Sequence, residues 1–355
     1  MSVIIFIAVL VVIVLVHEWG HFFAARSFGI RVDEFGFGFP PRILAKKVGE
    51  TIYSLNLVPL GGFVRLFGES GEGADNKKSF ASHPIWHRVV IILAGVFMNL
   101  VLAWVLFSIG FGIGVPSVGD SDTVNQKVTI TDVASDGPAA KAKISFGSIV
   151  EKLVATNESL VPKSADDLVF FVNRHKGETL HITIQNGSDT QVVDVEARKN
   201  PPAGEGPLGI ALADVGIYKV AWYKAPWYGA KSLWYALRAT LEAFGSIFKS
   251  GVIEGRIPES VSGPIGVFVL TNQFAKLGFV YFIQFVAALS VSLAVLNVIP
   301  FPGLDGGRIL FLLTEKIRGR PVHMRHEQLA HTAGIILILI LVLFISFHDV
   351  RHYFL

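Results

Sequence analysis

The sequence predicts an α-helical polytopic membrane protein with about four transmembrane helices and a soluble α+β domain inserted between the second and third of them. The 355 residues are 52% apolar and have a mean hydropathy of +0.54, which is high for an ordinary soluble protein. Four apolar stretches are long enough to cross a bilayer. Between the second and the third, residues 116–217 become polar and alternate between strand and helix patterns.

Changes in hydropathy, charge and helix breakers divide the chain into segments. In order they are a first span at 1–25, a loop with a β-hairpin at 26–88, a second span at 89–115, the α+β domain at 116–217, an interfacial amphipathic helix and linker at 218–278, a third span with a broken segment at 279–313, a loop at 314–328 and a last span at 329–348. Within the α+β domain we expect strands at 128–130, 149–153, 180–184 and 191–195, and helices at 138–142 and 164–173.

The hairpin is predicted from alternation on both sides of a turn. Tyr53–Val58 alternates like a strand, Pro59–Gly62 is typical of a turn, and Phe63–Phe67 alternates back. Two interpretations remain open. The hairpin is either a small cap packed on the bundle, or an edge strand that holds an extended peptide by backbone hydrogen bonds.

The stretch from Tyr218 to Lys249 is rich in Trp and Tyr, and Lys224, Lys231 and Arg238 recur in it every seven residues. Aromatic side chains favour the membrane interface and a basic stripe favours lipid headgroups. The pattern predicts an amphipathic helix at about Pro226–Phe248 that lies on the membrane surface.

Basic residues near the ends of the spans predict the topology. They gather between the first two spans and between the last two, and none lies in Ser2–Val16. The positive-inside tendency therefore places both of these loops in the cytoplasm, and both chain ends and the α+β domain outside it. These basic residues are Arg26, Arg31, Arg42, Lys46, Lys47, Lys77, Lys78, Arg88, Arg308, Lys316, Arg318, Arg320 and Arg325.

Composition excludes several function classes. The chain has no cysteine, which excludes disulfides, thiolate metal sites and cysteine nucleophiles. Its net charge of +3 is small and spread out, without the basic tract of a nucleic-acid-binding protein. We therefore expect membrane lipids as partners and no nucleic acid.

The first span ends in the pattern H-E-x-x-H, formed by His17, Glu18 and His21. Residues four apart lie on one face of a helix, so both imidazoles can reach one metal ion, and Glu18 stands where a general base is needed. The pattern follows Ser2–Val16, which carries no charged side chain. A zinc site for hydrolysis at membrane depth follows from this placement. The alternative is a helix end whose polar side chains face headgroups or pair with each other.

Asp305 is the expected third metal ligand. It lies in Asn297–Arg308, where two prolines and three glycines make a continuous helix improbable. Broken backbone at membrane depth is tolerated only where it is buried in protein or lines a wet cavity. The topology places Asp305 at the same depth as His17 and His21. One Zn²⁺ with ionised Asp305 and Glu18 sums to about zero charge, which lowers the cost of burial.

Two asparagines are candidates for supporting roles. Asn297 is either a donor to the oxyanion of the reaction or a helix residue ahead of the break. Asn99 closes the pattern G-x-x-x-N at Gly95–Asn99 and serves either helix packing or the site. Gly95 is expected to let another helix approach closely.

These residues resemble the site-2 protease (M50) family of intramembrane zinc metalloproteases, in particular its bacterial regulator-of-sigma-E-protease type. The resemblance is carried by H-E-x-x-H at His17–His21, G-x-x-x-N at Gly95–Asn99 and N-x-x-P-x-P-x-x-D-G at Asn297–Gly306. Ser262–Gly266 is also similar to a segment that precedes the family's third span.

The resemblance implies His17, His21 and Asp305 as ligands of one zinc ion, Glu18 as catalytic base, and Asn297 and Asn99 in substrate handling. It also implies a single PDZ-like soluble domain outside the cytoplasm, a membrane-associated β-hairpin, and location in the bacterial inner membrane. The substrate class would be a single-span protein, such as an anti-sigma factor already trimmed by another protease, or a signal-peptide remnant.

Two other function classes use the same features. A membrane scaffold would rely on its soluble domain and carry a non-proteolytic metal site. A metal transporter would use the same His and Asp residues, but transporters usually show repeated halves, and this sequence shows none.

Overall fold

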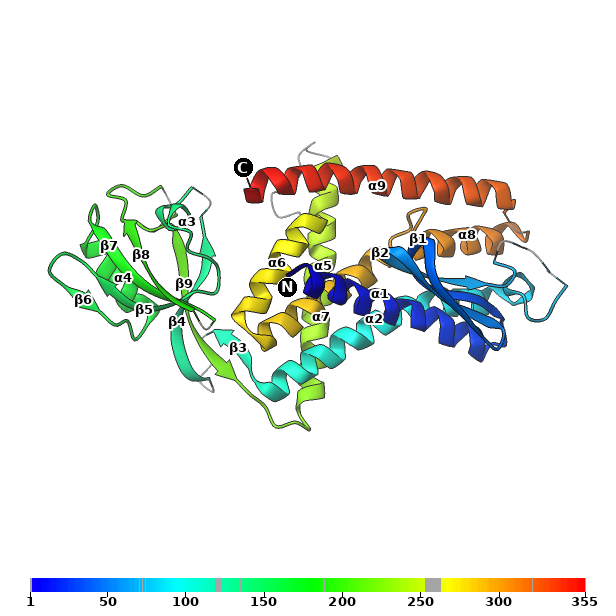
Figure 1. Cartoon of the computed structure of the whole chain (residues 1–355), viewed down its shortest axis with the longest axis horizontal. Coiled ribbons are helices and arrows are strands. Elements are labelled where there is room, and N and C mark those ends of the chain that lie inside the picture. Colours follow the sequence, from blue (N-terminus) through cyan, green and yellow to red (C-terminus); the bar gives the residue numbers. More distant parts are fainter. Residues whose placement is uncertain are drawn as a thin grey trace. The chain divides into compact units, whose positions relative to one another are not determined.

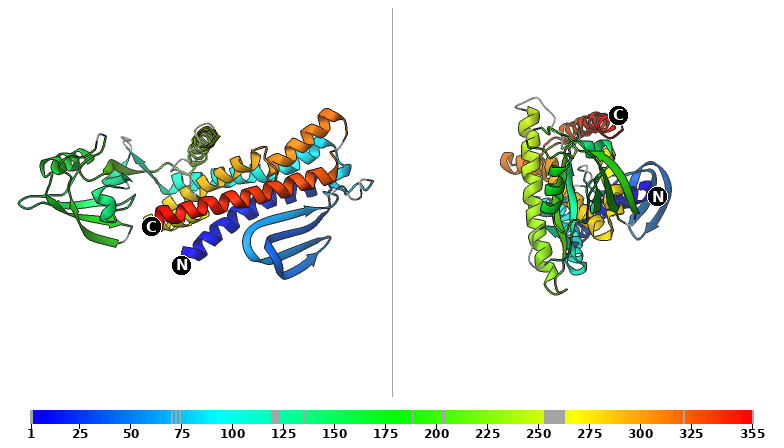
Figure 2. Two further views of the ribbon diagram at one scale, coloured as in Figure 1. Left: turned by 90° about the horizontal axis from the view of Figure 1, so that it is seen from above. Right: turned by 90° about the vertical axis from the view of Figure 1, so that its left-hand side faces the viewer.

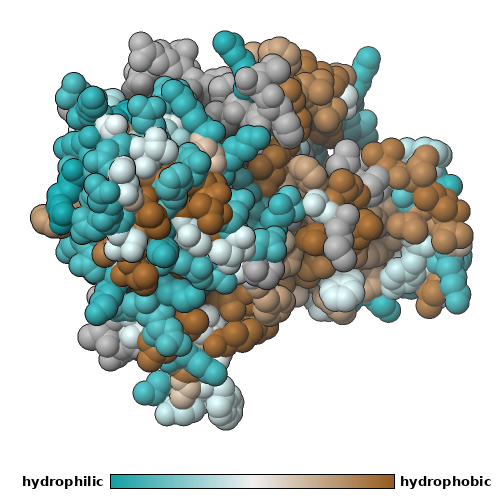
Figure 3. Space-filling model, turned by 60° about the vertical axis from the view of Figure 1, so that its left-hand side comes forward, coloured by the Kyte–Doolittle hydropathy of each residue, from teal (hydrophilic) through white to brown (hydrophobic). Residues whose placement is uncertain are grey.

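The computed structural model describes residues 2–354 except positions 70, 72, 74, 119–122, 135, 188, 203, 253–262 and 321. The chain forms two compact units (Figure 1). The helical unit comprises residues 1–108, 226–272 and 283–355, and the sheet unit comprises 109–225 and 273–282. Hydrophilic side chains gather over the sheet unit, and hydrophobic side chains cover much of the helical unit (Figure 3).

Among the described residues, four helices are long and apolar enough to cross a membrane, in agreement with the number expected. They are α1 (Ser2–Ser27), α2 (Ile85–Ile113), α7 (Phe279–Val298) and α9 (Met324–Phe354). The four run in similar directions (Figure 2). Helix α1 extends two residues beyond the predicted end of the first span at residue 25, and Arg26 lies within its last turn. The chain leaves the helix at Gly29, which takes φ +79°.

Helix α5 (Ala225–Val252) runs across these long helices (Figure 1). Its apolar side chains pack against a buried cluster from α2 and α7 that includes Phe107 and Val291. Trp227, Trp234 and Tyr235 remain exposed, as the interfacial interpretation requires.

Two further helices occupy segments expected to be linker and loop. Helix α6 (Pro264–Leu277) falls in the predicted linker, which is therefore partly helical, and α8 (Asp305–Arg318) covers residues 314–318, so the loop before α9 is shorter than predicted. In α8 the glycines that suggested a break, Gly306 and Gly307, lie in the first turn of the helix. A Cβ on Gly306 would stand 2.2 Å from the carbonyl oxygen of Ile299, so glycine serves close packing there.

Helix α6 is fastened to α9 at its first turn. The buried carboxylate of Asp349 accepts hydrogen bonds from the backbone N–H groups of Gly263 and Gly266, at 3.2 and 2.8 Å. These donors have no partner within the helix, and a carboxylate there also complements the helix dipole. In the segment Ser262–Gly266, which resembles one in the family, Gly263 and Gly266 therefore bind Asp349 through their backbone N–H groups. Ser262 lies outside the described residues.

The hairpin is formed by β1 (Val32–Val48) and β2 (Thr51–Leu66), which pair along most of their length. The chain reverses between them at Gly49 and Glu50, where Gly49 takes φ +63°.

Pro59–Gly62 is part of β2, and the chain reverses direction there, as predicted: residues 35–37 of β1 pair with Tyr53–Leu55 in the same direction and with Gly62–Val64 in the opposite direction. Phe35 pairs with both Tyr53 and Val64, so β1 lies between two parts of β2. Gly61 takes φ +84° at this reversal, and the two arms of the predicted hairpin lie on either side of β1 instead of pairing with each other.

The sheet unit contains a seven-stranded sheet in the order β3-β9-β4-β5-β7-β8, with β6 paired to β5. Helices α3 (Pro138–Lys141) and α4 (Ala165–Arg174) accompany it, and α4 begins with a capping box between Ser164 and Asp167. The strands are β3 (Val115–Val118), β4 (Val124–Val133), β5 (Ile149–Val154), β6 (Ser159–Leu160), β7 (Thr179–Asn186), β8 (Asp189–Glu196) and β9 (Ile210–Tyr218). Strands β3, β6 and β9 were not predicted.

Candidate metal centre

Helix α1 brings His17 and His21 together on its inner face. Their Nε2 atoms lie 3.1 Å apart, and His17 is buried. Trp19, between them in the sequence, points away and is 48% exposed. The helical spacing therefore produces the pair of inward imidazoles expected from the sequence.

Asp305 joins this pair from the first residue of α8. Its Oδ2 lies 3.1 Å from Nε2 of His17 and 3.4 Å from Nε2 of His21. One ligand atom from each residue falls within 4.8 Å of the others. Asp305 Oδ2 is buried and has no hydrogen-bond partner among the described residues. Two imidazole nitrogens and one carboxylate oxygen that converge in this way fit the donor set of a catalytic zinc ion.

A backbone carbonyl orients His21. The carbonyl oxygen of Ile91, on α2, lies 2.9 Å from Nδ1 of His21. It can only accept, so Nδ1 donates its proton and the Nε2 lone pair is left for a metal. Sequence reasoning missed Ile91, because a backbone acceptor leaves no mark on residue type.

Asn99 plays the corresponding part for His17. Its Nδ2 lies 3.5 Å from His17 Nδ1, and its Oδ1 is buried without a partner in the described structure. Turning the amide by 180° exchanges the two groups and lets Oδ1 accept the Nδ1 proton, which frees Nε2 of His17 for metal. The Ser290 hydroxyl, on α7, donates a hydrogen bond to the backbone carbonyl oxygen of Asn99 at 2.8 Å and so links α7 to α2 beside the site.

Asn297 lies in the last turn of α7, with its Nδ2 3.3 Å from Nε2 of His17. The structure therefore brings both expected asparagines to the cluster. Asn297 reaches the metal-facing nitrogen and Asn99 the opposite one.

Glycines allow α1 and α2 to approach closely at the site. A Cβ on Gly20 would stand 2.2 Å from the Ala94 carbonyl oxygen. A Cβ on Gly95 would stand 2.5 Å from Nε2 of His21 and 2.7 Å from Cε1 of His17. Gly95 thus leaves room for the ligand rings themselves, beyond the helix approach expected of it.

Replacing Gly95 with alanine is expected to displace the ligand rings and lower zinc affinity by about 10–100-fold, as for other residues that support metal ligands. Affinity is measured by chelator competition on purified protein. Gly112→Ala, in the same helix, is the matched control, because its nearest heavy atom lies 4.0 Å from the new methyl group. Both variants add one methyl group to α2, so equal zinc affinity in the two would contradict this role of Gly95.

The hairpin lies directly against Glu18. A Cβ on Gly62 of β2 would stand 3.0 Å from Cγ of Glu18 and 2.9 Å from a methyl carbon of Val14. Glu18 is half-buried and next in sequence to a ligand. The arrangement packs the acidic side chain that follows a candidate ligand against a strand backbone, a contact that the sequence did not predict.

Comparison with known proteins identifies the family. The family model described as peptidase family M50 matches residues 5–341. The chain belongs to peptidase family M50. Among similar proteins, the "Regulator of sigma-W protease RasP" of Bacillus subtilis shares 26% sequence identity with this chain, over 100% of this chain and 99% of its own length. A "Putative zinc metalloprotease" of Clostridium perfringens is 31% identical over 95% of each chain. A protein of Nostoc with the same description is 32% identical over 97% of this chain and 94% of its own.

This M50 protein is therefore a site-2-type zinc metalloendopeptidase of the membrane, and its cofactor is Zn²⁺. The chemistry of the converging donors agrees with that cofactor. Membership in a peptidase family favours the enzyme over the scaffold and the transporter.

Proposed function

We propose that His17, His21 and Asp305 hold one zinc ion and that Glu18 is the catalytic base of intramembrane peptide hydrolysis. The convergence of three buried or half-buried ligand atoms within 4.8 Å carries this assignment. When bound, zinc supplies a Lewis acid that activates water and polarises a scissile carbonyl. Glu18 takes the proton of the attacking water and passes it to the leaving amine.

Asn297 and Asn99 have different supporting roles, one towards the substrate and one towards His17. Asn297, 3.3 Å from the metal-facing nitrogen of His17, donates its amide N–H to the oxygen that becomes negative during attack. Asn99, buried on the other side of His17, fixes that ring.

The substrate is a single-span membrane protein that is held extended at the hairpin. A transmembrane helix keeps its carbonyls in internal hydrogen bonds, so it must unwind before it can be cut. The backbone of β2 at Gly62 touches Glu18, so a peptide aligned along the hairpin would pass the catalytic base.

The sheet unit is a single PDZ-like domain on the outer side of a bacterial inner membrane. The basic loops on the opposite side of the spans support this orientation. The domain filters substrates by size, so cleavage occurs in regulated intramembrane proteolysis after another protease has trimmed the outer part. The relative named regulator of sigma-W protease supports an anti-sigma factor as one such substrate.

A pair of single-span reporters tests this function in proteoliposomes that contain the zinc-loaded enzyme. One reporter keeps a folded outer domain and the other has lost it. We expect cleavage within or next to the membrane segment of the trimmed reporter, at least about tenfold faster than of the intact one, a difference of about 1.4 kcal/mol in activation free energy. Equal cleavage of both would contradict the filter, and cleavage of neither would contradict the substrate class.

A further inference from the structure

Helix α9 touches the broken segment that leads to Asp305 at two neighbouring points. Nδ1 of His331 accepts a hydrogen bond from the backbone N–H of Gly303 at 2.9 Å. Three residues further along α9, a Cβ on Gly334 would stand 1.9 Å from the carbonyl oxygen of Pro302. The helix backbone therefore lies directly on the loop.

The hydrogen bond secures the point at which the chain turns towards the site. Gly303 takes φ +98°, a left-handed conformation that favours glycine, and lies between α7 and α8. Outside a helix, a backbone N–H at membrane depth needs another acceptor, and His331 supplies one. Asp305 follows two residues later, so the position of this turn determines where the Asp305 carboxylate lies.

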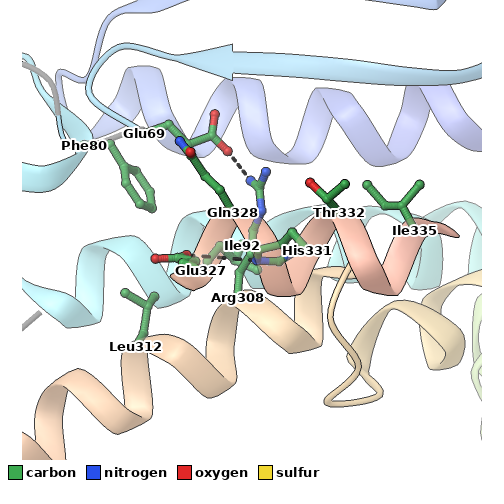
Figure 4. Close-up of a pocket in the computed structure, with 10 residues that line it drawn as sticks. All are labelled: Glu69, Phe80, Ile92, Arg308, Leu312, Glu327, Gln328, His331, Thr332 and Ile335. Carbon is green, nitrogen blue, oxygen red and sulfur yellow. Dashed lines mark hydrogen bonds and ion pairs between the residues drawn. The ribbon is translucent and has the colours of Figure 1, made fainter. Parts of the chain in front are cut away.

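His331 also lines a cavity of about 330 Å³ (Figure 4). Because Nδ1 accepts, the proton of the neutral ring is on Nε2. Nε2 is buried and has no hydrogen-bond partner in the described part of the chain; the nearest carboxylate oxygen, of Glu327, is 4.0 Å away. On the same cavity, Arg308 of α8 is paired with Glu69. Within the described residues, the hydrogen bond of the ring is therefore the one with the Gly303 N–H.

We propose that His331 is a positioning residue of the zinc site: it holds the Pro302–Gly303 turn so that the Asp305 carboxylate meets His17 and His21. The proposal rests on Asp305 being a zinc ligand. Gly334 assists by allowing α9 to approach the turn.

Asparagine and leucine at position 331 separate the hydrogen bond from packing. Their side chains are nearly equal in size and shape, but the Oδ1 of asparagine can accept from Gly303 at the place of the histidine Nδ1. Both substitutions are made in a Glu18→Gln background, and metal affinity is measured by chelator competition, so no readout depends on activity. The visible spectrum of the Co²⁺-substituted protein reports the coordination of the metal.

We expect His331→Leu to lower metal affinity about 10–100-fold and to change the Co²⁺ spectrum, as for lost supporting contacts at other metal sites. His331→Asn is expected to keep the metal affinity and the Co²⁺ spectrum of the parent protein. Gly334→Ala should resemble His331→Leu, whereas Gly245→Ala, with nothing within 4 Å of the new methyl group, should behave as the parent protein.

Wild-type affinity and spectrum in His331→Leu, or equal loss in His331→Asn and His331→Leu, would overturn the proposal. If His331→Leu does not fold, His331→Asn is compared with Gly334→Ala. Lower metal affinity in Gly334→Ala than in His331→Asn supports the proposal, and equal affinity in the two overturns it. Asp305→Asn separates the claim that Asp305 is a zinc ligand from the claim that His331 positions it. Unchanged metal affinity in that variant contradicts the ligand assignment itself, whereas a loss there together with an unaffected His331→Leu contradicts only the role of His331.

Discussion

Replacing Glu18 with glutamine is expected to abolish peptide hydrolysis while leaving zinc in place. The amide keeps the size of the side chain but cannot take a proton from water. Glu18 is not among the three converging ligand atoms, so the metal is retained. General acid–base catalysis contributes about 10²–10⁴-fold in rate, and we expect a loss of at least that order. The rate is measured on the trimmed reporter, and zinc per chain by elemental analysis.

Glu242→Gln is the matched control. Glu242 lies on the exposed surface of α5, where it pairs with Arg238 at 2.7 Å, and exposed pairs of this kind contribute little. It should hydrolyse the reporter at the wild-type rate. Hydrolysis by Glu18→Gln within about tenfold of wild type would remove Glu18 from the role of base.

Replacing Asp305 with asparagine is expected to empty the site of zinc. The carboxylate is the anionic member of the ligand set, and its Oδ2 reaches both imidazoles. A neutral amide of the same shape is a poorer ligand and leaves the ion's charge less compensated in a largely buried place. Affinity should fall by more than the 10–100-fold typical of supporting residues, that is, by over about 100-fold.

Asp132→Asn, in the sheet unit, controls for the loss of one carboxylate, because Asp132 accepts a hydrogen bond from the neighbouring backbone N–H of Val133 and lies away from the metal centre. The same chelator competition is run on both variants. Asp305→Asn with the zinc affinity of Asp132→Asn would show that the third ligand is another group.

The sequence predicts that His17, His21 and Asp305 come together, because each part of this prediction depends on a simple physical rule. Helical spacing alone orients His17 and His21, and their apolar surroundings demand a partner for them. The prolines around position 301 predict broken backbone, which at membrane depth has few permitted surroundings. Basic loops then place Asp305 at the matching depth without reference to any site.

What the sequence does not predict depends on contacts between distant segments. The sequence predicts the reversal around Gly62, but not that β1 lies between its two arms or that Gly62 packs against Glu18. Gly306 and Gly307 suggest a loop, yet they open α8, where backbone carbonyls leave no room for a Cβ. Propensity treats glycine as a breaker, and only the packed structure shows where its small size is the reason for its presence.

X-ray absorption at the zinc K-edge, on purified wild-type protein in nanodiscs, tests the central claim most directly. We expect one zinc ion per chain with two imidazole nitrogens at about 2.0–2.1 Å and one or more oxygens at about 2.0–2.2 Å, and a weaker oxygen contribution in any zinc retained by Asp305→Asn. A folded wild-type protein that binds no zinc, or zinc whose shell contains fewer than two imidazoles, would contradict the assignment of His17, His21 and Asp305.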